Sequence, residues 1–257
     1  MDRTFWHKQT PEKPLFPDLQ WSRPQTKAQS GKLLIVGGNA HGFSAAAEAY
    51  GAATKAGIGT ARVLLPDSLQ KTVGRVFAAG EYAPSTPSGS FSQQALAEVL
   101  DASAWADGTL LAGNLGRNSE TAILLEKFVA KYAGILSLTG DAADYFIKSP
   151  SHLLSRKNTL LVLSFEQLQK LATNAHFTTA FTSNMDFLHL VDGLHEFTQD
   201  NQVSIVVKHL ETVFVTVGGQ VSTTKQPTTA NAAQATVWLI QNPSKPFETI
   251  TASLAEI

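Results

Sequence analysis

The sequence contains no cysteine among its 257 residues. Disulfide bonds, thiolate nucleophiles and thiolate-ligated metals are therefore excluded. Only 16% of the residues are charged and the formal net charge is −1, so we expect no binding surface for nucleic acid or for an anionic membrane. No apolar run approaches the ~20 residues of a membrane span. Residues 1–16 lack the apolar core of a signal peptide, which predicts a cytoplasmic protein.

Three common site motifs are also missing. The chain has neither the Gly-x4-Gly-Lys-Ser/Thr phosphate loop nor the Gly-x-Gly-x-x-Gly turn of dinucleotide-binding folds. The segment from Gly42 to Ala46 lacks the second glycine of a serine-hydrolase elbow, and Ser44 suits the N-cap of a helix better. A P-loop enzyme, a dinucleotide-binding fold and a serine hydrolase are therefore not supported.

The most informative stretch runs from Gly31 to Leu65. An apolar run at 33–36 ends at two glycines, an alanine-rich segment begins near Ser44, and a second apolar run follows at 63–65. This order predicts a strand, a helix and a parallel strand. The small side chains make the helix thin, so we expect it to be buried against the sheet.

The rest of the chain alternates in the same way. The pattern predicts a three-layer α/β/α sandwich with a mostly parallel sheet over residues 31–257. Residues 1–30 contain four prolines and are expected to form an extended arm whose aromatic side chains lie against the body or a neighbouring subunit. Further strands are expected at 109–112, 135–138, 160–163, 178–181, 203–207 and 212–217, and helices at 67–80, 91–100, 118–131, 164–172, 184–197 and 228–241.

The segment GKLLIVGGN…GFSAAAEAYGAATKAGIGTARVLLP resembles the ribokinase-like superfamily, and more narrowly its ADP- or ATP-dependent NAD(P)H-hydrate dehydratases. The resemblance covers roughly residues 31–250. It implies a ribokinase-like fold with a ligand cleft at the carboxyl end of the sheet. It also implies ATP or ADP with Mg²⁺ as cofactors, an NAD(P)H hydrate as substrate, and homo-oligomeric assembly.

The resembled family carries Gly-Thr-Gly-Asp at the start of its last buried helix, where this sequence has Thr228, Thr229, Ala230 and Asn231. In the family the backbone N–H groups of this motif hold phosphate, and the aspartate is the general base. An asparagine cannot accept the proton at neutral pH, so Asn231 is expected to be catalytically inactive, while residues 228–230 could still bind phosphate. The alternative is that Asn231 only caps a helix.

Lys208 and Thr212 keep the lysine and threonine of the family's Lys-Gly-x-x-Thr turn, with His209 in place of the glycine. The resemblance implies that both residues contact a nucleotide. An exposed lysine in a hairpin would give the same pattern, and the sequence does not separate the two.

Five further residues are candidate substrate contacts because they follow the ends of predicted parallel strands, where open α/β sheets bind ligands. Asp141 matches the second carboxylate of a family Asp-Ala-Asp stretch and could equally cap a helix. No metal site is assigned: Asp186, His189 and Glu196 lie on the polar side of an amphipathic pattern. The candidates are Gly38, Asn39, Asn114, Gly116 and Asp141.

The departures from the family fall on the phosphate loop, the general base and the substrate carboxylate, whereas the sheet-forming segments are intact. We therefore expect a divergent dehydratase-like protein that binds a nucleotide or metabolite, or acts as a subunit scaffold, with reduced or lost catalysis. One alternative is an active dehydratase in which Asp141 or Glu211 replaces the missing base. The other is a small-molecule kinase of the same superfamily.

Overall fold

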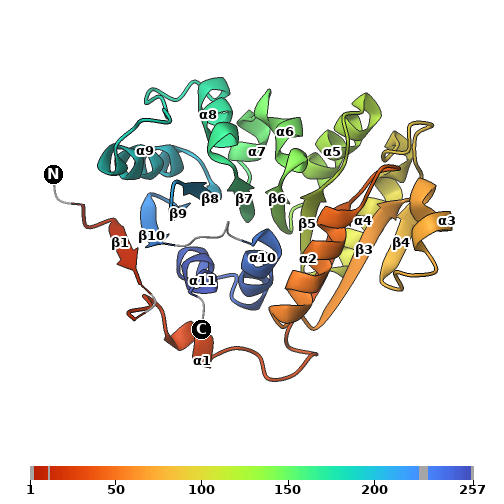
Figure 1. Cartoon of the computed structure of the whole chain (residues 1–257), viewed down its shortest axis with the longest axis horizontal. Helices are drawn as coiled ribbons and strands as arrows, with labels where there is room; N and C mark the ends of the chain where they lie inside the picture. Colours follow the sequence, from red (N-terminus) through yellow and green to blue (C-terminus); the bar gives the residue numbers. More distant parts are fainter. Residues whose placement is uncertain (1–2, 11, 226–230, 256–257) are drawn as a thin grey trace.

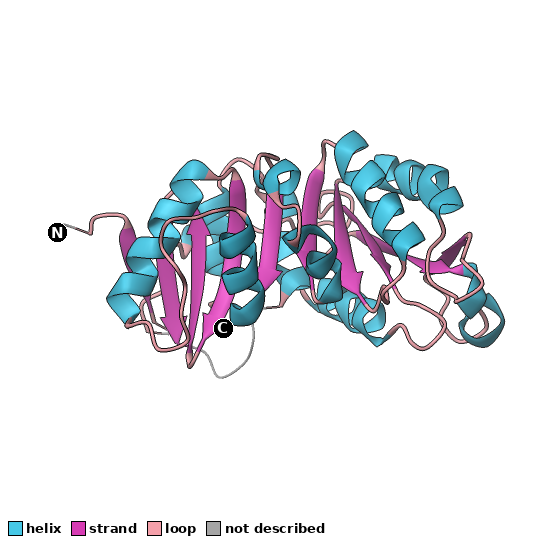
Figure 2. Ribbon diagram, turned by 90° about the horizontal axis from the view of Figure 1, so that it is seen from above, coloured by secondary structure: helices cyan, strands magenta, loops and turns pink. Residues whose placement is uncertain are grey.

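The computed structural model describes residues 3–10, 12–225 and 231–255. Within them ten strands form one sheet in the order β1-β10-β9-β8-β7-β6-β5-β2-β3-β4, with helices on both faces (Figures 1 and 2). All neighbouring strands are parallel except β8–β9 and β9–β10. The predicted three-layer sandwich with a mostly parallel sheet is confirmed. None of the described helices has both the length and the apolar composition that crossing a bilayer requires.

The strands are β1 Trp6–Gln9, β2 Lys32–Gly37, β3 Thr60–Pro66, β4 Gly80–Ala83, β5 Gly108–Gly113, β6 Ile135–Thr139, β7 Thr159–Leu163, β8 Val203–His209, β9 Thr212–Val217 and β10 Gln220–Lys225. The α-helices are α1 Asp18–Trp21, α2 Ser44–Lys55, α3 Gln70–Val73, α4 Leu96–Trp105, α5 Ser119–Lys131, α6 Asp141–Ile147, α7 Ser151–Leu154, α8 Phe165–Asn174, α9 Phe187–Asp200, α10 Ala232–Gln241 and α11 Pro246–Ser253. Two short 3₁₀ turns, η1 Asp67–Leu69 and η2 Gln93–Ala95, precede α3 and α4.

Each central strand contributes to two separate hydrophobic cores. In β7, Leu161 and Leu163 pack with helices α4 to α9, whereas Leu160 and Val162 face the layer of α2, α3, α10 and α11. Strands covered on both faces have no polar side, which is why these segments are continuous apolar runs in the sequence.

Helix α2 is less buried than its composition suggested. Only Ala46 and Ala53 are buried, while Glu48, Gly51 and Thr54 are exposed. The small residues bring one side of the helix against the sheet and α10, and the other side faces solvent. The expectation of a buried helix therefore holds for one side only.

Several segments differ from the predicted secondary structure. The predicted helix at 67–80 ends at Val73, and Gly80 begins strand β4, which pairs with β3. Residues 178–181 are irregular, so the predicted strand is wrong: Phe181 is buried by stacking on Phe177 and by contact with Phe197, not by strand pairing. In the N-terminal segment, β1 pairs in parallel with β10, and α1 forms one helical turn despite the neighbouring prolines. β1 is therefore the edge strand of the sheet, next to β10.

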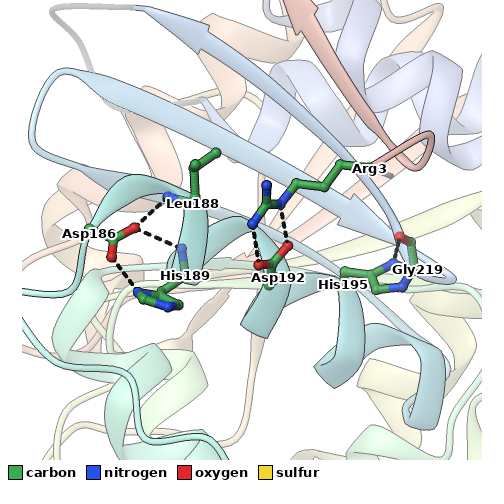
Figure 3. A network of polar contacts seen from close by, with 7 residues as sticks. All are labelled: Arg3, Asp186, Leu188, His189, Asp192, His195 and Gly219. Atoms are coloured by element: carbon green, nitrogen blue, oxygen red, sulfur yellow. Dashed lines mark hydrogen bonds and ion pairs between the residues drawn. The ribbon is translucent and has the colours of Figure 1, made fainter. Parts of the chain in front are cut away.

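The N-terminal segment is fixed to α9 by polar contacts (Figure 3) and by one aromatic contact. Arg3 Nε and Nη2 donate to the two carboxylate oxygens of Asp192, at 2.7 and 2.8 Å. Phe5 stacks on the ring of His195 with centroids 3.6 Å apart, and His195 Nδ1 donates to the carbonyl oxygen of Gly219. We call these contacts of Arg3 and Phe5 the arm clip.

Three further polar residues at or in α9 lie on its solvent side, as the amphipathic pattern predicted. Asp186, His189 and Glu196 are exposed. Asp186 accepts hydrogen bonds from the backbone N–H groups of Leu188 and His189, and so caps the helix and pairs with the His189 ring (Figure 3).

The arm clip predicts an acid-sensitive N-terminal strand. The hydrogen bonds from Arg3 lower the pKa of Asp192 below its ordinary value. An aspartate has a pKa of about 3.9 in the unfolded chain. When folding lowers this pKa, the carboxylate stabilises the folded state fully at pH values above about 3.9, and the stabilisation is lost as the pH falls through the lowered pKa of the folded state. Hydrogen exchange of residues 3–10, corrected for intrinsic rates, should therefore accelerate below pH ~4.

The variant Asp192→Asn should show accelerated exchange of residues 3–10 already at neutral pH, because the charge that binds Arg3 is gone. Glu196→Gln removes an exposed carboxylate from the same helix and should leave this exchange unchanged. Equal protection of residues 3–10 in Asp192→Asn and in the unchanged protein would contradict the role of the clip.

Candidate functional site

Three adjacent parallel strands, β6, β5 and β2, end at the same edge of the sheet, and each runs into a turn that contains glycine. These turns bring together all five candidate substrate contacts predicted from the sequence: Gly38, Asn39, Asn114, Gly116 and Asp141. Hydrogen bonds link them into one network. The carboxyl edge of a parallel sheet is where open α/β folds bind ligands.

Asn114 connects two of the turns. Its carbonyl oxygen accepts a hydrogen bond from Asn39 Nδ2 at 2.5 Å. Its side-chain Oδ1 accepts from Ala45 N at 2.8 Å and from Ser44 Oγ at 3.2 Å. Helix α2 has no side-chain cap of its own, since Ser44, predicted as the N-cap, is its first helical residue. Asn114, in the left-handed region with φ of 55°, therefore caps this helix from the neighbouring loop.

Asp141 holds the same loop from the other side. Its Oδ1 accepts from Leu115 N at 3.3 Å and its Oδ2 accepts from Gly116 N at 3.2 Å. Its place in the first turn of α6 is also favourable for a carboxylate. The side chain thus fixes the loop after β5, and a substrate contact would use its remaining lone pairs.

Two glycines allow the loop to approach this carboxylate. Gly113 and Gly116 have φ values of 105° and 77°, which L side chains rarely adopt. A Cβ at Gly113 would lie 3.2 Å from Asp141 Oδ1, and one at Gly116 would lie 2.9 Å from Ser90 Oγ. The glycines of the loop are therefore required by its geometry, independently of any ligand.

Asn231 lies at the N-terminus of α10. Its Oδ1 accepts hydrogen bonds from Ala233 N at 3.0 Å and from Gln234 N at 3.2 Å. At the other end of this helix Ile240 contacts Gly108, the first residue of β5. Helix α10 therefore runs antiparallel to β5, and its N-terminus, with Asn231, is at the end nearer the edge where β5 ends. Among the described atoms its side chain is a helix cap; the neighbouring Thr228, Thr229 and Ala230 lie outside the described residues.

Lys208 and Thr212 flank the tight turn between β8 and β9 but lie on opposite faces of the sheet. Lys208 follows the alternation of Val206 and is on the face of α10 and α11. Thr212 pairs with His209, whose ring stacks on Phe165 of α8 with centroids 4.1 Å apart. Burial lowers the pKa of His209. The two predicted nucleotide contacts thus share an edge of the sheet and not a face.

Two residues that were not among the predicted site residues complete this edge. Tyr145, one turn into α6, donates its hydroxyl to the carbonyl oxygen of Gly116, and burial raises its pKa. Gln167 Nε2 donates to the carbonyl oxygen of Gly140 at 2.8 Å. Only Gln167 had a local signal, because Ser164-x-x-Gln167 has the pattern of a capping box.

The edge therefore combines backbone N–H groups, side-chain amides and the carboxylate of Asp141. Such groups can orient a small polar molecule by hydrogen bonds. In the described part of the chain no group of three or more histidine, aspartate or glutamate side chains could hold a metal ion.

Comparison with solved structures identifies the fold. A ribokinase-like superfamily protein from Enterococcus faecalis V583 superposes with a TM-score of 0.72 at 14% identity, over 99% of this chain and 87% of that chain. The fold is ribokinase-like. The ADP/ATP-dependent NAD(P)H-hydrate dehydratase of Bacillus subtilis, co-crystallised with ATP/Mg²⁺, gives a TM-score of 0.57 at 11% identity, over 90% of this chain and 80% of that chain. No family model and no curated protein matches the sequence.

The network around Asp141 gives a stability prediction. Asp141→Ala leaves the N–H groups of Leu115 and Gly116 without acceptors, and Leu115 is fully buried. We expect a loss of about 1–3 kcal/mol in the free energy of unfolding. Asp141→Asn keeps one oxygen acceptor and should lose less. Denaturant titration measures both.

Glu126→Ala is the matched control, because it removes an exposed carboxylate from α5. It should change the free energy of unfolding by less than about 0.5 kcal/mol. If Asp141→Ala were as stable as Glu126→Ala, the carboxylate would not be holding the loop.

Proposed function

We propose that this chain is a divergent relative of the NAD(P)H-hydrate dehydratases that binds a nucleotide or a related metabolite and has reduced or lost catalysis. The ribokinase-like fold and the polar edge formed by β2, β5 and β6 support a small-molecule partner. The hydrogen bonding of Asn231 is the observation that carries the proposal of reduced turnover.

The resembled chemistry needs a carboxylate that accepts a proton from the substrate hydroxyl as phosphoryl transfer develops. An asparagine amide is not basic at neutral pH, and the Oδ1 of Asn231 already accepts from Ala233 N and Gln234 N. Aspartate and asparagine are equally good N-caps. The amide therefore preserves the helix start while it removes the base.

The residues fit the implied cofactors only in part. A phosphate at the N-terminus of α10 would compete with Asn231 Oδ1 for the N–H groups of Ala233 and Gln234. Mg²⁺ is commonly held by one or two carboxylates together with phosphate oxygens and water. Asp141 could supply one such carboxylate, because each of its oxygens accepts a single backbone N–H and keeps a free lone pair. When bound, Mg²⁺ would neutralise phosphate charge.

The two alternatives require a base elsewhere. Asp141 is engaged with Leu115 and Gly116, and Glu211 is exposed in the β8–β9 turn. In the described part of the chain neither carboxylate is hydrogen-bonded or ion-paired with Asn231. A kinase of the same superfamily would need the same base. Homo-oligomeric assembly and a cytoplasmic location stay predictions of the sequence.

The test compares Asn231→Asp with Asn231→Ser. Both replacements can cap α10, but only aspartate adds a carboxylate. Nucleotide-dependent loss of chemically hydrated NADPH should be at background in the unchanged protein and in Asn231→Ser. Asn231→Asp should be faster, since a positioned general base contributes roughly 10²–10⁴-fold.

Thermal-shift measurements with ATP, ADP and NADPH test binding separately from turnover, because a ligand selective for the folded state raises its melting temperature. A shift without turnover is the expected result. Turnover by the unchanged protein at the level of Asn231→Asp would refute reduced catalysis, and the absence of any shift would favour a scaffold.

A further inference from the structure

A cavity of about 380 Å³ lies at the carboxyl ends of β1 and β10, beside the start of α9. It is at the same edge of the sheet as the Asn39–Asn114–Asp141 network but several strands away. Its volume falls within the range of small-molecule sites. Its walls are contributed by β1, β9, β10, α9 and the residues that follow β1.

Two aromatic side chains form one wall of this cavity. Trp6 and Phe187 have ring centroids 5.4 Å apart and are tilted by 59°. Trp6 is fixed by its Nε1, which donates to Thr223 Oγ1 at 3.0 Å, and Phe187 rests on Phe214 with centroids 5.4 Å apart. Phe187 nevertheless remains 39% exposed. A fixed, partly exposed aromatic pair is a surface on which a planar ring can pack.

Two lysines line the same cavity. Lys8 is on the Trp6 face of β1, and Lys225 is on the Thr223 face of β10, because side chains alternate along each strand. A lysine ammonium binds phosphate as a point charge. The Glu12 carboxylate and the Thr212 hydroxyl also line the cavity and can accept hydrogen bonds from amino groups of a ring.

We propose that this cavity binds a nucleotide, with the base against Trp6 and Phe187 and the phosphate at Lys8 and Lys225. The aromatic wall, the acceptors and the two lysines match the ring, the amino groups and the phosphate of such a ligand. This assignment rests on the proposed function, in which the protein binds a nucleotide or a related metabolite, and it adds where the ligand lies.

The cavity exists only when the N-terminal segment is docked, because Trp6, Lys8 and Glu12 all belong to that segment. The arm clip holds it in place through Arg3 and Phe5, neither of which lines the cavity. A ligand that binds only the docked state stabilises that state by mass action. Nucleotide binding and docking of residues 3–10 are therefore linked.

The first experiment uses calorimetry to measure how tightly the double variant Lys8→Gln/Lys225→Gln binds ADP and adenosine. The matched control, Lys71→Gln/Lys148→Gln, removes the same charge from exposed positions that do not line the cavity. The first variant should bind ADP about tenfold more weakly or worse, since charge-assisted hydrogen bonds to phosphate are lost. The control should bind as the unchanged protein does, and adenosine should not distinguish the proteins.

Equal ADP affinity in the two double variants would overturn the assignment to this cavity and leave the proposed function standing. If the unchanged protein bound none of ATP, ADP and NADPH, both would be overturned. Circular dichroism checks that both double variants are folded. We expect them to be, because all four lysines are exposed.

The second experiment tests the linkage. ADP should slow hydrogen exchange of residues 3–10, and Asp192→Asn, which does not touch the cavity, should weaken ADP binding. Glu196→Gln on the same helix should not. The linkage would be refuted if Asp192→Asn bound ADP as tightly as the unchanged protein does. It would also be refuted if saturating ADP left the hydrogen exchange of residues 3–10 unchanged.

Discussion

The close approach of two backbones at the ends of β2 and β5 is the constraint on which the edge of the sheet depends. Gly38 N donates to the carbonyl oxygen of Gly113 at 3.0 Å. A Cβ at Gly37 would lie 2.7 Å from the same oxygen, closer than real Cβ contacts. Only glycine permits this spacing, and the spacing brings the Asn39 turn within reach of Asn114. The polar network is thus a consequence of backbone packing before any ligand is considered.

The elements that could be predicted are those whose signal is local. Strand β7 is a continuous apolar run because both its faces are covered, and Asn118 caps α5 through bonds to Glu120 N and Thr121 N, two and three residues away. Strand β10 was missed because its consecutive serine and two threonines give no apolar run; they are buried with polar contacts, such as Ser222 Oγ with Thr251 Oγ1 at 2.7 Å. These partners are far away in sequence.

The candidate site shows the same division. That Gly38, Asn39, Asn114, Gly116 and Asp141 gather at one edge follows from parallel strands with turns at their carboxyl ends. That Asn114 caps α2, 69 residues earlier, does not follow from any pattern near either position. That Lys208 and Thr212 lie on opposite faces depends on the length of the turn between them: Thr212 pairs with His209, and Lys208 is the neighbour of His209 on the other face.

At Asn231 the requirements of a helix cap and of a general base differ. A cap needs an oxygen that accepts two N–H groups, whereas a general base needs an oxygen that accepts and keeps a proton. Asparagine satisfies the first requirement and fails the second. Selection for a stable α10 would therefore tolerate the amide, whereas selection for turnover would not.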